Sequence, residues 1–181
     1  MDRRNFVAGA PLIAAGATVA SASVEDAAQG RHFAVMKAVI MGWRQGDRQA
    51  VIARLADDIV WHSHVGSPPI IGKEATARFM ETLAGQMKNV RWRIFSYAEQ
   101  GDTALAEGVD EFTSPEGRQI ALPYAGIMRF RDGLITEWRD YFDRGLFDRL
   151  KAGEAPPPHI VALTGRTPLF SGLFLGSTCP C

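Results

Sequence analysis

Cysteine is almost absent from this chain. Of its 181 residues only Cys179 and Cys181 are cysteines, and both lie at the extreme C-terminus. With a single residue between them, they cannot cross-link a core. In an oxidising compartment they could pair with each other or with another chain, and otherwise they belong to a frayed tail. The core must therefore be held together without disulfide bonds.

The sequence also lacks an excess of either charge, since 20 Lys and Arg residues balance 20 Asp and Glu residues. There is no basic patch that would favour nucleic acid, and there is no acidic tail. Internal repeats, a phosphate loop and a dinucleotide fingerprint are absent as well. The one apolar run, near the N-terminus, is too short and too rich in Gly to span a membrane. We expect neither a nucleic-acid partner nor a stable membrane span once this segment is removed.

The N-terminal segment, residues 1–22, has the pattern of an export signal. Arg3 and Arg4 precede an Ala- and Gly-rich run, and Ala20-Ser21-Ala22 is a small-residue cleavage site. The paired arginines resemble a twin-arginine signal, although Asp2 stands where Ser or Thr is usual. An ordinary secretory signal or a short lipid anchor is the alternative. We expect a mature protein that is periplasmic or secreted.

Residue periodicity predicts helices first and then a run of strands. Helices are predicted over 27–42, 48–55, 73–87 and 146–151. Strands are predicted over 59–64, 90–98, 103–112, 118–130 and 134–142, and short turns join the last four as hairpins. This order is typical of an α+β fold, here a strongly curved sheet that is covered by the N-terminal helices and encloses a pocket.

The C-terminal part of the chain differs from the domain that we expect over residues 23–152. Residues 153–181 are rich in Pro, Gly and apolar side chains. They form a tail packed on the outside, a lid over the pocket or a dimer contact. A homodimer is also suggested by Phe95 and Tyr97, which share the outer face of their strand with Arg91 and Arg93.

Two carboxylates stand on apolar faces of predicted strands. Asp110 shares a face with Phe112 in one strand, and Asp140 shares a face with Trp138 and Phe142 in another. A carboxyl group in such a place has a partner or a raised pKa. Both acids are therefore candidates for proton transfer. The apolar residues expected to bind a hydrophobic small-molecule substrate are Trp138, Phe142, Tyr124, Met128 and Phe112.

The strand before Pro68-Pro69 adds two imidazoles. With a period of two, His62 and His64 share one face, and if that face looks inward both enter the cavity of the two acids. His-x-His is also a spacing that zinc or iron ligands use. Solvated histidines are a further alternative. We favour His62 and His64 as catalytic residues of a pocket without metal or cofactor.

From about residue 34 to 150 the chain resembles the limonene-1,2-epoxide hydrolase branch of the NTF2-like (SnoaL-like) superfamily. The resemblance depends on Ile135-Thr136-Glu137-Trp138-Arg139-Asp140-Tyr141-Phe142-Asp143, on the loop Pro68-Pro69-Ile70-Ile71-Gly72, and on Glu107-Gly108-Val109-Asp110. It implies a cone-shaped fold in which helices close the open side of a strongly curved mixed sheet.

The resemblance also implies roles. The acid at the position of Asp140 takes a proton from water, and the acid at the position of Asp110 protonates the epoxide oxygen. Counting back from the Pro-Pro loop, His62 and His64 stand where the family has a tyrosine and an asparagine that hold the water. The family's arginine between the two acids is missing, because Gly108 occupies its position.

The resemblance thus predicts a cofactor-independent hydrolase that opens a small hydrophobic epoxide. Without the arginine, Asp110 and Asp140 repel each other, which raises the pKa of one of them unless a protonated His62 or His64 replaces the missing charge. Two alternatives remain open. One is a SnoaL-like isomerase, dehydratase or cyclase, which moves a proton beside a carbonyl or eliminates water. The other is a non-catalytic protein that binds a hydrophobic small molecule.

Overall fold

The structure, a computed structural model, describes residues 30–170. The predicted export signal over residues 1–22 and the last part of the tail, with Cys179 and Cys181, lie outside the described residues and stay predictions. Among the described residues, no helix has the length and apolar character needed to cross a membrane.

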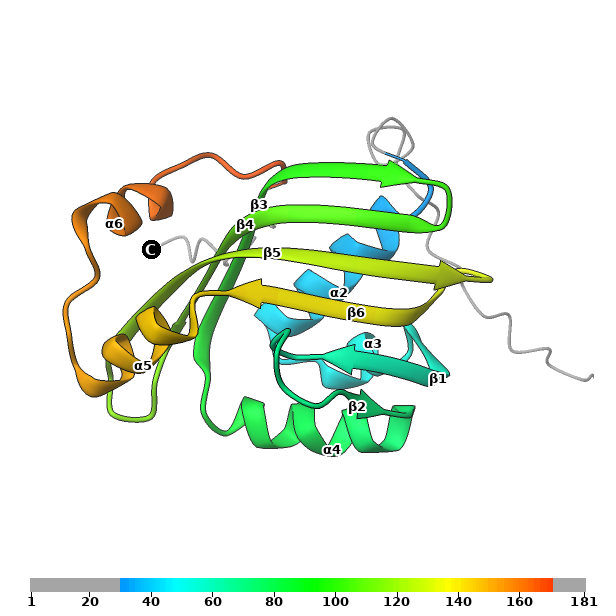
Figure 1. Cartoon of the computed structure of the whole chain (residues 1–181), viewed down its shortest axis with the longest axis horizontal. Coiled ribbons are helices and arrows are strands. Elements are labelled where there is room, and N and C mark those ends of the chain that lie inside the picture. The colour runs from blue at the N-terminus through cyan, green and yellow to red at the C-terminus, as the bar shows by residue number, and fades with distance from the viewer. Residues whose placement is uncertain (1–29, 171–181) are drawn as a thin grey trace, which may run out of the picture.

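A curved six-stranded sheet forms the centre of the fold (Figure 1). Its strands are β1 (Leu55–His62), β2 (Ile70–Ile71), β3 (Lys88–Gln100), β4 (Thr103–Thr113), β5 (Gln119–Arg131) and β6 (Leu134–Phe142). They lie side by side in the order β2-β1-β6-β5-β4-β3. Strands β1 and β6 run parallel, whereas every other neighbouring pair is antiparallel. The mixed, strongly curved sheet predicted from the sequence is confirmed.

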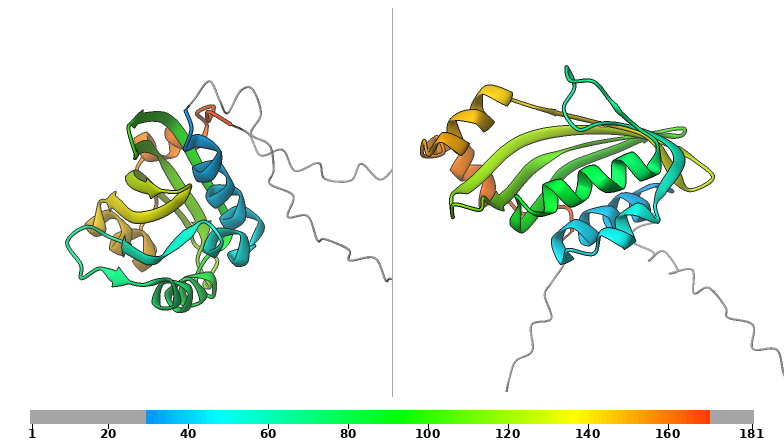
Figure 2. Two further views of the ribbon diagram at one scale, coloured as in Figure 1. Left: turned by 90° about the vertical axis from the view of Figure 1, so that its right-hand side faces the viewer. Right: turned by 90° about the horizontal axis from the view of Figure 1, so that it is seen from below.

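Three helices lie on the concave side of the sheet (Figure 2). They are α2 (Phe33–Gln45), α3 (Arg48–Ile52) and α4 (Lys73–Ala84). The Asp47 side chain caps α3 by accepting a hydrogen bond of 3.0 Å from the Ala50 backbone N–H. Met36 and Met80, from α2 and α4, are buried against the sheet together with Trp138. The predicted cover of N-terminal helices is therefore confirmed.

The two remaining helices, α5 (Arg144–Ala152) and α6 (Pro158–Thr164), follow the last strand. Helix α5 begins two residues before the predicted start at residue 146, because Asp143 caps it and accepts a hydrogen bond of 3.0 Å from the Leu146 N–H. Helix α6 is not predicted from the sequence. Pro158 is its first residue, where a missing N–H costs nothing.

The described part of the tail packs on the outer face of the sheet through α6 and then reaches the edge strand β3, where the Leu169 N–H donates to the Ile94 carbonyl oxygen at 2.8 Å. Phe170 lies against Phe33 of α2. Ile160 of α6 is buried in one cluster with Val109 and Ala121. The Arg166 guanidinium lies 4.5 Å from the centre of the Phe95 ring, which is only 7% exposed. The aromatic surface that suggests a homodimer is thus covered at Phe95 by the protein's own tail, and the homodimer stays a prediction.

Candidate active site

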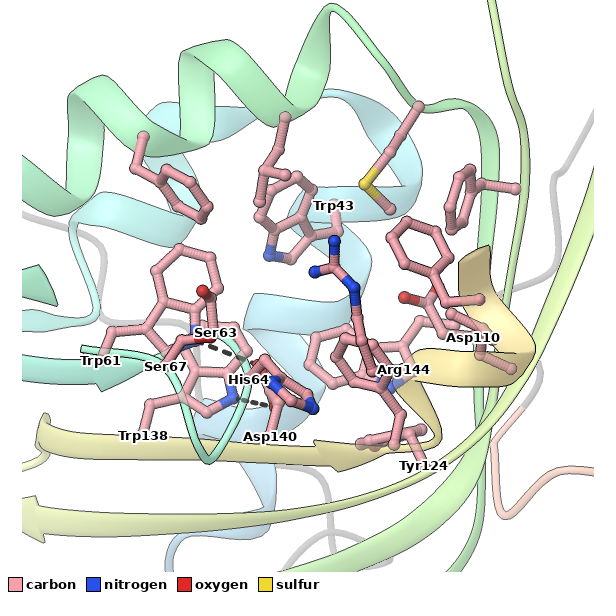
Figure 3. A pocket seen from close by; sticks show the side chains of 18 of the residues that line it. Trp43, Trp61, Ser63, His64, Ser67, Asp110, Tyr124, Trp138, Asp140 and Arg144 are labelled. Atoms are coloured by element: carbon pink, nitrogen blue, oxygen red, sulfur yellow. Dashed lines mark hydrogen bonds between the residues drawn. The ribbon is translucent and has the colours of Figure 1, made fainter. Parts of the chain in front are cut away.

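A cavity of about 440 Å³ lies between the inner face of the sheet and the helices (Figure 3). Its wall is mostly apolar and comes from all six strands, from α2, α4 and α5, and from the loops after β1 and α4. The lining residues that the chemistry uses are Trp43, Trp61, Ser63, His64, Ser67, Trp92, Asp110, Phe112, Tyr124, Trp138, Asp140, Phe142, Arg144 and Phe147. Both predicted acids therefore reach one common cavity, which the sequence could only suggest.

Asp140 is held by two indole groups. In β6 the side chains of Trp138 and Asp140 point inward, and the parallel pairing sets Trp61 of β1 beside Trp138. The Trp61 Nε1–H donates to Asp140 Oδ2 at 3.0 Å, and the Trp138 Nε1–H donates to Oδ1 at 2.7 Å. Because an indole N–H only donates, both contacts favour the carboxylate form and fix its orientation.

The pKa of Asp140 is nevertheless raised, from 3.8 to about 7. Burial is the main cause, because the apolar cavity disfavours the charged form. The hydrogen bonds from Trp61 and Trp138 lower the pKa in part, and the charge of Asp110 raises it again. A carboxyl group with a pKa near neutrality can both take up and release a proton under physiological conditions.

Asp110 projects from β4, between Trp92 of β3 and Leu122 of β5. Its Oδ1 atom is shielded from solvent and has no hydrogen-bond partner, although the residue as a whole is partly accessible. Burial raises the pKa of Asp110 to about 7, and the neighbouring Glu111 charge adds to the rise. Unlike Asp140, Asp110 has no donor that favours its anion, so Asp110 is better suited to carry the proton.

Gly108, where the resemblance led us to expect an arginine, lies against the backbone of β3. A Cβ at this residue would overlap the carbonyl oxygen of Arg93. The pairing of β3 with β4 is irregular between Ile94 and Ser96, next to this contact. No side chain, and hence no bridging arginine, fits here without a shift of the backbone.

Replacing Gly108 with alanine is therefore expected to destabilise the protein by about 3 kcal/mol or more, because the new methyl group forces β3 away from β4. The matched control is Gly85→Ala at the end of α4, where φ is −67° and a Cβ would have ordinary contacts of 3.6 Å or more. Urea unfolding, followed by circular dichroism, measures both. Equal stability of the two variants would contradict the close contact at Gly108.

The two histidines do not share a face, and the prediction for His62 is wrong. Trp61 pairs with Trp138 and His62 with Arg139, so Trp61 faces the cavity and His62 does not line it. Strand β1 ends at His62, and in the following loop both Ser63 and His64 line the cavity. The alternation of the strand is broken there. His64 therefore does line the cavity, but it does so from a loop and not from the predicted strand face.

The loop that carries His64 is tied to β6. The Val65 backbone N–H donates to the Asp140 carbonyl oxygen at 2.9 Å, and the His64 ring lies 4.8 Å from the Phe142 ring. Within residues 30–170, no three His, Cys, Asp or Glu side chains gather closely enough to hold a metal ion. The His-x-His spacing thus does not form a shared ligand set.

Four of the five predicted substrate-binding residues line the cavity: Phe112, Tyr124, Trp138 and Phe142. The fifth, Met128, does not. It pairs with Trp138 across β5 and β6, and it is buried beside Met36, where helix α2 covers the sheet. The cavity lies nearer the other end of β6, toward Phe142, so Met128 belongs to the core.

Sequence reasoning misses several lining residues, above all Trp61, Trp92, Trp43 and Arg144. The Trp61 and Trp138 rings stack at 5.0 Å, and the Trp92 and Trp138 rings at 5.7 Å. Strand periodicity does place Trp92 on an apolar face, which is the available signal. The same periodicity puts Trp61 on the face opposite to the cavity. It also predicts that helix α5 begins at residue 146, so Arg144 falls outside the predicted helix.

Tyr124 carries a buried hydroxyl group, and in the described structure neither this hydroxyl nor the Trp92 Nε1 atom makes a hydrogen bond of normal geometry. The two rings are 5.2 Å apart, and the contact with the indole only partly offsets the rise in the pKa of Tyr124 that burial causes. Tyr124→Phe is expected to raise the free energy of unfolding by about 1 kcal/mol, since it removes an unsatisfied polar group. Tyr97→Phe, which removes a hydroxyl bonded to Glu99, is the control and should lower it. A loss of stability in Tyr124→Phe would mean that the hydroxyl has a partner, such as a buried water. Thermal unfolding measures both variants.

Comparison with known proteins finds relatives of this chain in sequence and in fold. The protein is similar to epoxide hydrolase EphG of Mycobacterium tuberculosis, with 29% identity over 116 residues, which covers 64% of this chain and 74% of that protein. An LEH-like epoxide hydrolase of M. tuberculosis superposes with a TM-score of 0.60 at 27% identity, covering 74% of this chain and 95% of that one. An NTF2-like protein of unknown function from Burkholderia pseudomallei superposes with a TM-score of 0.61 at 21% identity, covering 66% and 95%, and shows the fold alone.

The pattern that defines the SnoaL-like domain matches residues 36–138, which is more than half of the chain. This stretch runs from helix α2 to Trp138 and includes Asp110 and Gly108, while Asp140 follows two residues later. The fold, the cavity and this match together identify the protein as a member of the SnoaL-like family of NTF2-like proteins.

Proposed function

We propose that this protein is a hydrolase that opens a small hydrophobic epoxide with water and needs no cofactor. The observation that carries the proposal is the pair of carboxyl groups, Asp110 and Asp140, in one apolar cavity, each with a pKa raised to about 7. At neutral pH such a pair holds about one proton between its two members. The similarity to proteins named epoxide hydrolases supports the same reaction.

In the proposed reaction Asp140 is the general base and Asp110 the general acid. Asp140 accepts a proton from a water molecule, whose oxygen attacks a carbon of the epoxide. The carbon–oxygen bond of the ring breaks, and its electrons go to the epoxide oxygen, which takes the proton of Asp110. The product is a diol, and a proton returns from Asp140 to Asp110 through solvent. Each proton transfer contributes about 10²–10⁴-fold to the rate.

The assignment of these roles follows from the hydrogen bonds. Asp140 accepts from the indoles of Trp61 and Trp138, which support its charged form as a base. Asp110 Oδ1 has no donor, which favours its protonated form. His64 and Ser63 line the same cavity and are the side chains that we propose to orient the attacking water. Phe112, Phe142 and the indoles would surround the apolar body of the substrate.

The test is hydrolysis of cyclic, terpene and aryl epoxides in ¹⁸O-labelled water. The reaction is run under single-turnover conditions, in which no enzyme molecule converts more than one epoxide. Direct attack by water puts ¹⁸O into the diol during this first turnover. Attack by a carboxylate through a covalent ester would give a diol without label, because its oxygen comes from the protein. Glu137→Gln, a carboxylate on the outer side of β6, should behave like the wild type. No turnover across the panel would contradict the proposal.

A second function is favoured by Gly108. Because no cation is fixed at that residue, the developing alkoxide of an epoxide lacks the support that an arginine would give. The same acids could instead move a proton beside a carbonyl, as in a SnoaL-like isomerase, dehydratase or cyclase. Deuterium from D₂O would then enter the position next to the carbonyl of a bound ketone such as 2-tetralone, and no diol would form from epoxides. If neither reaction occurs, a non-catalytic binding role is what remains.

A further inference from the structure

Three of the polar groups of the cavity that are not acids come from the loop after β1 and from the start of α5. We call this group the mouth; it consists of Ser67, His64 and Arg144, and both Ser67 and Arg144 are exposed to solvent. Ser67 and His64 come from the loop after β1, and Arg144 is the first residue of α5. In Figure 3 the Arg144 side chain extends over the cavity from the start of α5. A mouth with a cation above apolar walls fits an amphiphilic ligand.

Two phenylalanine rings hold the basic groups of the mouth in place. The His64 ring packs 4.8 Å from Phe142, Phe142 lies 5.9 Å from Phe147, and the Arg144 guanidinium lies 5.4 Å from the centre of the Phe147 ring. A guanidinium over an aromatic face keeps its planar edge free for hydrogen bonds. The two groups are therefore fixed on one rim although they are distant in sequence.

The Arg144 guanidinium is only partly used. Its Nε–H donates to the two carboxylate oxygens of Asp148 at 3.1 and 3.3 Å, and this pair is more than half exposed. Within residues 30–170, the two terminal nitrogens of Arg144 have no hydrogen-bond partner. These terminal nitrogens can each donate to an anionic oxygen. Arg144 is also not among the groups that shift the pKa of Asp110 or Asp140, so it is free to serve another part of the ligand.

We propose that the mouth binds a carboxylate of the substrate through Arg144, with Ser67 as a further polar contact, while His64 stays with the attacking water. The substrates would then be apolar acids, whose hydrocarbon body lies among the indoles and whose reacting group lies at Asp110 and Asp140. The inference rests on the proposed function only in taking the substrate to occupy this cavity. It adds a cationic group that binds an anion to a site that is otherwise built for uncharged compounds.

The experiment compares two ligands of the same shape, the anion 2-naphthoate and the uncharged 2-naphthamide, by isothermal titration calorimetry at pH 8. The wild type should bind the carboxylate about 10-fold more tightly than the amide, as expected for a charge-assisted hydrogen bond. Arg144→Gln should abolish this preference and leave the affinity for the amide unchanged. Asp148→Asn should increase the preference, because it removes a negative charge that lies beside the guanidinium and repels the ligand carboxylate.

Arg149→Gln is the matched control, since Arg149 lies on the same helix, pairs with Glu154 and does not line the cavity. It should keep the preference for 2-naphthoate. Equal affinities of the wild type for both compounds, no binding of 2-naphthoate, or an unchanged preference in Arg144→Gln would overturn the inference. Because binding is measured without turnover, the comparison of the two ligands can be interpreted even if the protein hydrolyses no epoxide. If the protein hydrolyses epoxides but does not prefer 2-naphthoate, only the carboxylate-binding role of Arg144 is refuted.

Discussion

At pH 8 the Asp110→Asn variant is expected to be more stable than the wild type by on the order of 2–4 kcal/mol. The pKa of Asp110 is about 7 in the folded protein and near 3.8 in the unfolded chain. When the pH lies between these two pKa values, the folded state binds more protons than the unfolded state. The wild type therefore loses stability as the pH rises from about 4 to 7. An amide has no charge to bury, and Oδ1 has no donor whose bond would be lost.

Urea unfolding at pH 5 and pH 8 measures this effect. The advantage of Asp110→Asn should be large at pH 8 and should shrink toward pH 5, where the wild-type carboxyl group is protonated in the folded state. Asp57→Asn is the control, because the Asp57 side chain is 95% exposed and makes only a surface ion pair with Lys73. An advantage that is the same at both pH values would show that Asp110 is not a buried acid with a raised pKa.

Asp140→Asn is expected to lower kcat for epoxide opening by about 10²–10⁴-fold, because an amide cannot take a proton from water.

The two indoles make Asp140→Asn less favourable for folding than Asp110→Asn. Trp61 and Trp138 both donate, and an amide can accept through only one of its two terminal atoms, so one indole N–H faces an NH₂ group. We therefore expect little or no gain in stability from Asp140→Asn at pH 8.

Single-turnover rates of the wild type, Asp140→Asn and Glu137→Gln separate this role from a structural one. Glu137 is on the same strand but pairs with Arg129 and Arg139 outside the cavity. Its amide variant should retain the wild-type rate. Calorimetry with 2-naphthamide should show that Asp140→Asn still binds a ligand. Full activity of Asp140→Asn would remove Asp140 from the reaction.

Strand periodicity is sufficient to predict the hairpins and the two acids. Strands β4, β5 and β6 are joined by short turns, so their register is local, and the alternation that puts Asp110 and Asp140 on apolar faces persists in the structure. The resemblance to limonene-1,2-epoxide hydrolases agrees with this pattern. It places Gly108 where that family has an arginine, but only the structure reveals that a side chain at Gly108 would overlap the carbonyl oxygen of Arg93.

Strand β1 shows where such reasoning stops. Its partner β6 lies more than 70 residues away and runs parallel, and nothing local indicates which face of β1 meets the helices. A period of two alone cannot decide between His62 and Trp61, and the prediction of the His62 face is wrong. Arg144 is missed for a related reason, since its approach to the cavity depends on how α5 packs beside Phe142.

The protein has four tryptophans, Trp43, Trp61, Trp92 and Trp138, and every one of them borders the cavity. Its indole fluorescence therefore originates entirely at the site, with no background from elsewhere in the molecule. Any compound that enters should change the intensity or wavelength of that light. A library can thus be screened for occupants without a label or a cofactor, and before any turnover has been detected.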